Sequence, residues 1–294
     1  MAAADGFAAF DPLLEAAGTA SPWDAGGVYV PDHALLARLL AVPTQARQTS
    51  RSGRFARAID AWVAHELRRA GFGADEVWPR ARRPRVLPHD VAELLARLPR
   101  SLAADVARRL EDLPSVAPTD ARVLGRAYEK QVDVCVSRWD RGPELLISTK
   151  AQTSSFGKNL PNRFEEAYGD AGNLRGRYPL AAVGFLFVQR DTVLTREPDA
   201  FERAVDMIRT LRDQGGGDGY TATGLVLAGW DDAAPAATMR VADDAVPDDV
   251  RAPQFFARMI AQVLRAAPVT THVAVRQRLR GRLPAPGDAG TGAV

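Results

Sequence analysis

The chain has 294 residues, of which 46% are hydrophobic and 25% are charged, so it can bury a substantial core and has the composition of an ordinary globular protein. Its formal net charge of +2 excludes binding to nucleic acid through an overall positive field, so any such binding must use local basic patches. The single cysteine, Cys135, excludes an intramolecular disulfide, and four scattered histidines without CxxC or HExxH spacing argue against a zinc site.

The first residues, Met-Ala-Ala-Ala-Asp, lack the basic start and the apolar run of a secretion signal. No apolar stretch of the sequence approaches the length of a transmembrane helix. We therefore expect a cytoplasmic protein with no membrane partner.

Residues 1–118 are predicted to form a mostly helical region. A short helix is expected around Ala34–Leu40, and a longer helix is expected from Ser52 because apolar residues recur at helical spacing as far as Leu67. Gly71 supplies a stop for that helix. Two shorter helices are expected around residues 91–98 and 106–113, and Glu76–Arg80 is a candidate for an additional strand.

Residues 119–270 are predicted to form an α/β core with a mixed sheet. Thr119 or Asp120 could cap a helix that runs to Tyr128. The elements expected after it are, in order, a hairpin of strands Gln131–Val136 and Leu145–Lys150, a helix from Pro161 to about Leu174, a buried strand Ala181–Val188, a helix around residues 201–211, a buried strand Thr221–Ala228 and a helix around residues 255–264. Residues 271–294 are expected to form a basic and partly disordered tail.

Lysine and asparagine are confined to one short window of this arginine-rich chain. The three lysines and the three asparagines all lie between residues 130 and 173: Lys130, Lys150, Lys158, Asn159, Asn162 and Asn173. A lysine ammonium can approach a phosphate or a water as a guanidinium cannot, so the two cations are not interchangeable. We interpret this window as the functional centre.

Within the window, the predicted hairpin places Asp133 and Lys150 on one face of the sheet. Its turn pairs Asp133 with either Ser148 or Lys150, so the β-carbons of Asp133 and Lys150 should lie about 5–8 Å apart. On the following helix, Glu165 is predicted to lean towards the sheet and Glu166 to be solvated. Two carboxylates and a lysine suit a Mg²⁺ site. A cross-strand ion pair between Asp133 and Lys150 is the alternative interpretation.

This arrangement resembles the PD-(D/E)xK nuclease superfamily, and more particularly its restriction endonucleases. The resemblance covers about residues 119–190. Its acidic strand is Gln131-Val-Asp-Val-Cys-Val and its lysine strand is Leu145-Leu-Ile-Ser-Thr-Lys, followed by Lys158-Asn-Leu-Pro-Asn-Arg-Phe-Glu-Glu ahead of the apolar run from Pro179. Gly125-Arg-Ala-Tyr-Glu129 is similar to the helix that often precedes the acidic strand. One departure is Ser148, which stands where an acidic residue is expected. Glu165 would then be the relocated metal ligand, with Glu166 as the second choice.

The resemblance implies a restriction-endonuclease-like mixed central sheet flanked by helices. It also implies a Mg²⁺-dependent, site-specific endonuclease that hydrolyses double-stranded DNA and leaves 5′-phosphates. The catalytic residues would be Asp133, Lys150 and Glu165, with Asp133 and Glu165 as metal ligands. Supporting roles would fall to Ser148, Gln152, Glu129 and Glu166. By analogy, we expect a homodimer whose helical N-terminal region serves in DNA recognition or dimerisation, and a separately encoded DNA methyltransferase is a further partner considered.

Several polar and basic residues are candidates for DNA contact: Arg47, Arg51, Arg54, Lys158, Asn159, Asn162 and Arg163. Two further arginine clusters, at residues 80–85 and 276–282, are open to two interpretations, namely phosphate binding or ordinary surface charge. Two other functions also stay open. One is a nuclease of DNA repair or of modified DNA, and the other is a catalytically inactive DNA-binding protein, which Ser148 favours.

Overall fold

The computed structural model describes residues 5–46, 53–110, 112–213 and 219–281. Its strands are β1 (Val77–Trp78), β2 (Ala121–Leu124), β3 (Glu129–Val132), β4 (Val134–Arg138), β5 (Gly142–Gln152), β6 (Ala182–Arg190), β7 (Ala222–Gly229) and β8 (Arg240–Val241). Its α-helices are α1 (Asp11–Glu15), α2 (His33–Gln45), α3 (Arg54–Arg69), α4 (His89–Arg97), α5 (Arg100–Leu110), α6 (Leu160–Arg175), α7 (Val193–Arg196), α8 (Pro198–Arg212), α9 (Pro235–Thr238), α10 (Ala252–Ala266) and α11 (Val273–Leu279). Short 3₁₀ turns lie at Ala8–Phe10, Asp243–Ala245 and Asp248–Val250.

A mixed six-stranded sheet forms the centre of the molecule, with the strand order β1-β4-β5-β6-β7-β8. Strands β5, β6 and β7 run parallel to one another, and the remaining neighbours pair antiparallel. Strands β6 and β7 are apolar and buried almost throughout, as strands covered on both faces must be. The predicted α/β class with a mixed sheet is therefore confirmed.

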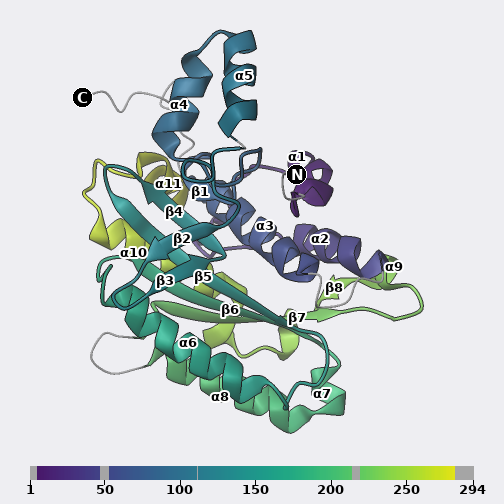
Figure 1. Cartoon of the computed structure of the whole chain (residues 1–294). Helices are drawn as coiled ribbons and strands as arrows, with labels where there is room; N and C mark the ends of the chain where they lie inside the picture. The colour runs from purple at the N-terminus through teal and green to yellow at the C-terminus, as the bar shows by residue number, and fades with distance from the viewer. Residues whose placement is uncertain (1–4, 47–52, 111, 214–218, 282–294) are drawn as a thin grey trace.

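Helices cover both faces of this sheet (Figure 1). Helices α3 and α10 pack on one face, where the core includes Trp62, Phe255 and Phe256. Helices α6 and α8 pack on the other face, where the core includes Phe164 and Phe185. The alternation of side chains along each strand decides which face a residue joins, so Ile147 belongs to the first core while its neighbour Leu146 on β5 belongs to the second.

The N-terminal region is mostly helical, as predicted, but it shares its core with the sheet. Helices α2 and α3 lie within the core on the α10 side. The candidate strand at residues 76–80 exists as β1, which pairs Val77 with Val136 and Trp78 with Cys135 at the edge of the sheet. By contrast, α4 and α5 form a hairpin with a small core of its own that projects from the body (Figure 1).

The helix predicted between residues 119 and 128 is wrong. This segment forms the two-stranded sheet of β2 and β3, which pairs Ala121 with Val132 and Leu124 with Glu129. The turn between the strands is held by Asn173 of α6, whose Oδ1 accepts hydrogen bonds from the backbone N–H groups of Ala127 and Tyr128 at 2.8 and 3.2 Å. A tertiary contact therefore decides the local structure here.

Part of the predicted C-terminal tail is an ordered helix. Helix α11 lies against the body, and Arg276 at its centre donates hydrogen bonds to the backbone carbonyls of Leu264 and Ala267 at the end of α10. Residues 282–294, on which the prediction of disorder falls, lie outside the described residues.

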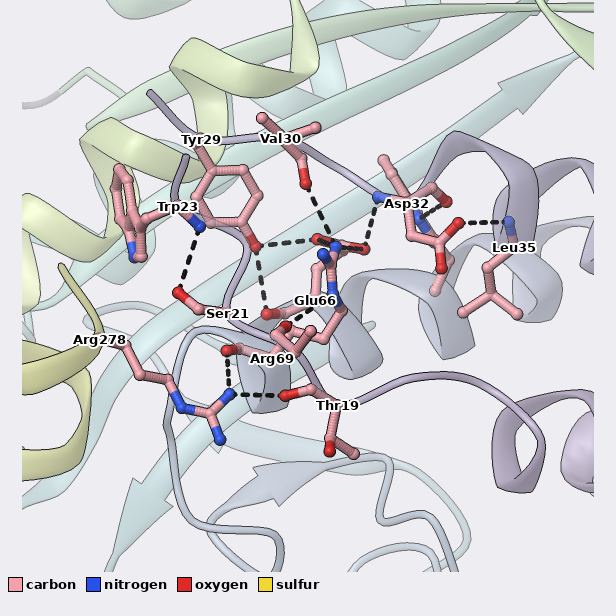
Figure 2. A network of polar contacts seen from close by, with 12 residues as sticks. Thr19, Ser21, Trp23, Tyr29, Val30, Asp32, Leu35, Glu66, Arg69 and Arg278 are labelled. Atoms are coloured by element: carbon pink, nitrogen blue, oxygen red, sulfur yellow. Dashed lines mark hydrogen bonds and ion pairs between the residues drawn. The ribbon is translucent and has the colours of Figure 1, made fainter. Parts of the chain in front are cut away.

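A buried carboxylate ties the N-terminal segment to α3 (Figure 2). Glu66 is fully buried and accepts hydrogen bonds from the Tyr29 hydroxyl, from the Asp32 backbone N–H and from Arg69, at 2.9–3.0 Å. Arg278 of α11 donates to the backbone carbonyl of Thr19, 3.0 Å away, and to that of Arg69. Three segments distant in the sequence therefore meet on α3.

Among the described residues, no helix combines the length and the apolar character needed to cross a membrane.

Candidate functional site

Asp133 lies at the break between β3 and β4. Its backbone N–H donates to the carbonyl of Ile147, 3.2 Å away, and the next strand pair joins Val134 with Ile147. That register places Asp133 opposite Ser148, which is one of the two pairings predicted from the sequence. The Asp133 carboxylate oxygen Oδ2 accepts hydrogen bonds from Ser148 Oγ at 3.3 Å and from the Thr149 backbone N–H at 2.8 Å.

A second aspartate, Asp60, reaches the same place from α3. Its Oδ1 accepts a 2.5 Å hydrogen bond from Thr149 Oγ1, so Thr149 holds Asp133 through its backbone and Asp60 through its side chain. Asp60 is only 6% exposed. Asp60 was not predicted from the sequence, although it is the one acid within the apolar run Ala58–Ala64, and an isolated acid in an apolar run is a signal of a functional position.

The two carboxyl groups perturb one another. Burial raises the pKa of Asp60 well above its usual range, and the nearby Asp133 charge raises it further. Burial also raises the pKa of Asp133, while the Thr149 N–H and the charge of Lys150 act in the opposite direction. Strongly perturbed carboxyl groups in a concave site are characteristic of functional positions.

Both aspartates line a cavity of about 230 Å³. Its polar wall also includes Arg57 of α3, Gln131 of β3 and Asp120 in front of β2. The cavity therefore opens between the start of α3 and the β2–β3 hairpin, and it combines two carboxylates with a guanidinium.

Lys150 contacts Glu166, and Glu165 lies elsewhere. The Lys150 Nζ is 3.2 Å from Glu166 Oε1, and the same oxygen accepts from Lys130 Nζ at 3.3 Å. Glu165 is exposed, and within the described part of the chain it makes no hydrogen bond or ion pair. The helix thus turns Glu166 towards the lysines, which is the reverse of the predicted orientation, and it does not bring Glu165 beside Asp133.

The predicted supporting residues have separate roles. Ser148 contacts Asp133 directly. Gln152 is buried and donates from Nε2 to the carbonyls of Ser155 and Phe156, both at 3.0 Å, so it shapes the loop after β5. Glu129 is exposed and pairs with Arg122 across the β2–β3 hairpin, 3.1 Å away, and it does not line the cavity.

The predicted DNA-contacting residues fall into two groups. Lys158, Asn159 and Asn162 are exposed at the start of α6. Arg163 is half-buried, its Nε has no hydrogen-bond partner among the described residues, and burial lowers the pKa of its guanidinium. Arg54 begins α3, whereas Arg47 and Arg51 lie outside the described residues.

The other two arginine clusters bind their own chain. Arg80 pairs with Asp75, and Arg85 pairs with Asp5 and Asp11 at 2.8 and 2.7 Å. Arg276 caps the end of α10, as described above. These contacts account for several of the clustered arginines without an external phosphate.

The fit of a Mg²⁺ ion to these residues depends on how many protein ligands it needs. Within the described ranges, no three His, Cys, Asp or Glu side chains gather closely enough to hold a metal by themselves. Mg²⁺, however, usually takes one or two carboxylates and completes its shell with water and substrate phosphate. Asp60 and Asp133 supply such a pair, and burial raises the pKa of both carboxyl groups, so a bound cation would stabilise their ionised forms. The donor set therefore fits the ion through Asp60 and Asp133.

Comparisons with protein-family models, with characterised proteins and with solved structures gave no match to this chain.

Proposed function

We propose that this protein is a Mg²⁺-dependent endonuclease that cleaves double-stranded DNA at specific sites, in the manner of restriction enzymes, on a restriction-endonuclease-like sheet. The observation that carries the proposal is the buried pair of Asp60 and Asp133, which are joined by Thr149, open to one cavity and lie within the field of Lys150. An ordinary cross-strand ion pair between Asp133 and Lys150 would not need the second carboxylate.

The proposed ligand set differs from the one that the sequence indicated. Asp133 keeps its role, and Asp60 takes the place of Glu165 as the second carboxylate. When bound there, Mg²⁺ would lower the pKa of a water molecule and neutralise charge on a phosphoryl oxygen. Thr149 and Ser148 orient the two carboxylates, because both donate hydrogen bonds to them.

Lys150 is proposed to act beside the attacking water. Its ammonium group can donate to a water or to the developing charge on the scissile phosphate, which a preorganised cation does at little cost in reorganisation. The exposed residues Lys158, Asn159 and Asn162 at the start of α6 are proposed to contact the DNA backbone or base edges near this point.

The test is digestion of mixed-sequence plasmid DNA with Mg²⁺, with an EDTA arm, followed by sequencing of the cut ends. Asp60→Asn, Asp133→Asn and Lys150→Met should each slow cleavage about 100-fold or more. Glu202→Gln, an exposed carboxylate on α8, is the matched control. Cleavage that survives Asp60→Asn but is lost in Glu165→Gln would restore the original ligand set and refute the present one.

A catalytically inactive DNA-binding protein is the second candidate. It is favoured by Ser148 in place of an acid and by the lack of a three-ligand cluster in the described part of the chain. That function predicts salt-sensitive DNA binding without metal-dependent turnover. Cutting that requires damaged or modified DNA would instead favour the repair or modification-dependent nuclease.

A homodimer is proposed because two copies of one site are the simplest means of cutting both strands of a symmetric sequence. Light scattering on the DNA complex should give the mass of two chains. Fragments that persist only when the DNA is unmethylated would support a methyltransferase partner.

A further inference from the structure

Four alternating charges lead from Lys150 into the body of the molecule. Lys150 Nζ contacts Glu166 Oε1 at 3.2 Å, and the same oxygen contacts Lys130 Nζ at 3.3 Å. Lys130 Nζ in turn lies 2.5 Å from Asp170 Oδ2. Two of the three lysines in the chain therefore share a single carboxylate oxygen.

In this row of four charges, Asp170 is anchored by burial, whereas Glu166 is not. The Asp170 side chain is 4% exposed, and it also accepts a 3.0 Å hydrogen bond from the Tyr128 hydroxyl. Lys130 is 17% exposed, and the bonds to Asp170 and Glu166 raise its pKa against the effect of burial. Glu166 is half exposed and projects from the surface of α6. Its position is thus set by the two lysines more than by packing.

The four charged residues also belong to different secondary-structure elements. Lys130 lies on β3, Lys150 on β5, and Glu166 and Asp170 one helical turn apart on α6. Lys150 additionally acts on the two aspartates of the cavity, because its charge lowers the pKa of both Asp60 and Asp133. Lys150 therefore interacts with two negative groups, with Glu166 by direct contact and with the aspartate pair through its field.

We infer that Lys130 is a positioning residue for Lys150, acting through the shared oxygen of Glu166, with Asp170 holding Lys130 in place. This inference rests on the proposed nuclease function of the same site. Lys130 neutralises part of the attraction that Glu166 exerts, so Lys150 stays available to the aspartate pair. Without Lys130, Lys150 would be the one cation among the described residues left in contact with Glu166, with Arg163 acting on Glu166 only through its field, and Glu166 would draw Lys150 towards α6.

The relation also explains why these positions hold lysine in a chain where 35 of the 38 cationic residues are arginine. A compact ammonium can contact Asp170 and Glu166 from one atom, whereas a guanidinium spreads its donors over a planar fork. Two ammonium groups can also approach one carboxylate oxygen, as Lys130 and Lys150 do.

The first test is a double-mutant cycle on DNA cleavage at saturating substrate. Lys130→Met should lower kcat about 2- to 10-fold with a smaller change in KM, because the change acts on Lys150 and not on DNA binding. In a Glu166→Gln background, Lys130→Met should have a much smaller effect, because only the direct field of Lys130 at Asp133 is then lost. Arg122→Met is the matched control, since it removes one positive charge from the same hairpin but contacts Glu129. Equal losses from Lys130→Met in both backgrounds would overturn the inference.

The second test does not depend on cleavage. Protein labelled with ¹³Cε-lysine should give three lysine signals, assigned by replacing each lysine in turn. Lys130→Met and Asp170→Asn should both shift the Lys150 signal and leave that of the exposed Lys158 in place. An unmoved Lys150 signal, in protein shown by circular dichroism to be folded, would overturn the inference. If the Lys150 signal shifts in the variants as expected but the wild-type protein does not cut DNA, the proposed function is refuted and the positioning of Lys150 by Lys130 is not.

Discussion

At the scale of single residues, Asp60 and Asp133 are two acids of the candidate site whose pKa is raised by burial. Both are buried, and each lies in the field of the other, so burial and like charge act in the same direction on the pKa of Asp60. Ionised carboxylates in such places cost folding free energy. A substitution that removes such a charge from a functional site should therefore increase the free energy of unfolding.

Asp60→Asn should therefore raise stability while it abolishes activity. The asparagine Oδ1 can still accept the Thr149 hydrogen bond, so the main change is the loss of a buried charge. At pH 8 the free energy of unfolding should rise by about 0.5–2 kcal/mol, measured by urea denaturation. Thr149→Val, which leaves the carboxylate without its donor, should lower it.

The pH dependence of stability follows from the same carboxyl group. The folded protein keeps the Asp60 proton to a higher pH than the unfolded chain does, because the folded pKa is raised. The free energy of unfolding should thus fall as pH increases from the usual aspartate range through the raised pKa. Urea denaturation across this range should show a smaller fall in Asp60→Asn; identical profiles would contradict the raised pKa.

A divalent cation should offset part of the folding free energy that is lost by burying the ionised carboxylates of Asp60 and Asp133. Mg²⁺ that binds the folded state alone stabilises it by about 2.7 kcal/mol at 100 times its dissociation constant. Thermal denaturation should show a Tm that rises with Mg²⁺ in the wild type and in Glu165→Gln. In Asp60→Asn and Asp133→Asn the rise should be lost, and a rise that persists in both would place the cation elsewhere.

At the scale of elements, the orientation of α6 explains why Glu166 and not Glu165 reaches the lysines. The apolar pattern of α6 would place Tyr168 on the buried face, but Tyr168 is exposed and Asp170 is buried. Since successive residues are 100° apart on a helix, this exchange rotates the buried face towards Glu166 and away from Glu165. The rotation follows from the bonds that Asp170 makes with Tyr128 and Lys130, which the periodicity of α6 alone does not contain.

The β2–β3 hairpin depends on a close approach between two elements. A β-carbon at Gly125 would lie 2.2 Å from the Asn173 side chain, which holds the turn of the hairpin. Gly125→Ala should therefore destabilise the protein by about 1–3 kcal/mol in urea denaturation. Gly172→Ala, where a β-carbon would meet no other group among the described residues, is the control and should not destabilise α6.

At the scale of the whole molecule, α3 connects the helical N-terminal region to the sheet. It carries Asp60 to the cavity, and six residues further on it carries Glu66 to the network that holds residues 19–32 and α11 (Figure 2). Every residue of α3 from Ala58 to Leu67 is buried. The catalytic geometry proposed here and the integrity of the N-terminal region therefore depend on one helix.

Glu66→Ala should separate the role of α3 in holding the N-terminal region from its role in placing Asp60 at the cavity. Removal of the carboxylate leaves Arg69 and the Asp32 N–H without their acceptor in a buried place, which typically costs about 3–5 kcal/mol. The expected result is a large drop in the urea midpoint, with Mg²⁺ still stabilising whatever fraction remains folded. Glu15→Ala, at an exposed glutamate, should leave the midpoint unchanged.

Most helices and the buried strands could be predicted from the sequence because their hydrophobic periodicity is a local property of the chain. The pairing of Asp133 was predicted only as far as two registers, with Ser148 or with Lys150, and the structure has the first of them. The β2–β3 hairpin could not be predicted in this way. Its strands are short, and its turn is held by Asn173, 45 residues further along the chain.

By itself the sequence determined the hairpin that brings Asp133 beside the strand of Ser148 and Lys150, because the apolar pattern of its two strands is a local property of the chain. Only the tertiary structure decided which further carboxylates would join them. Asp60 comes from a helix more than 70 residues earlier, and Glu166 faces the lysines because Asp170 is drawn inward. Local patterns record which side of an element is apolar, whereas the meeting of polar groups from distant elements depends on how whole faces pack together.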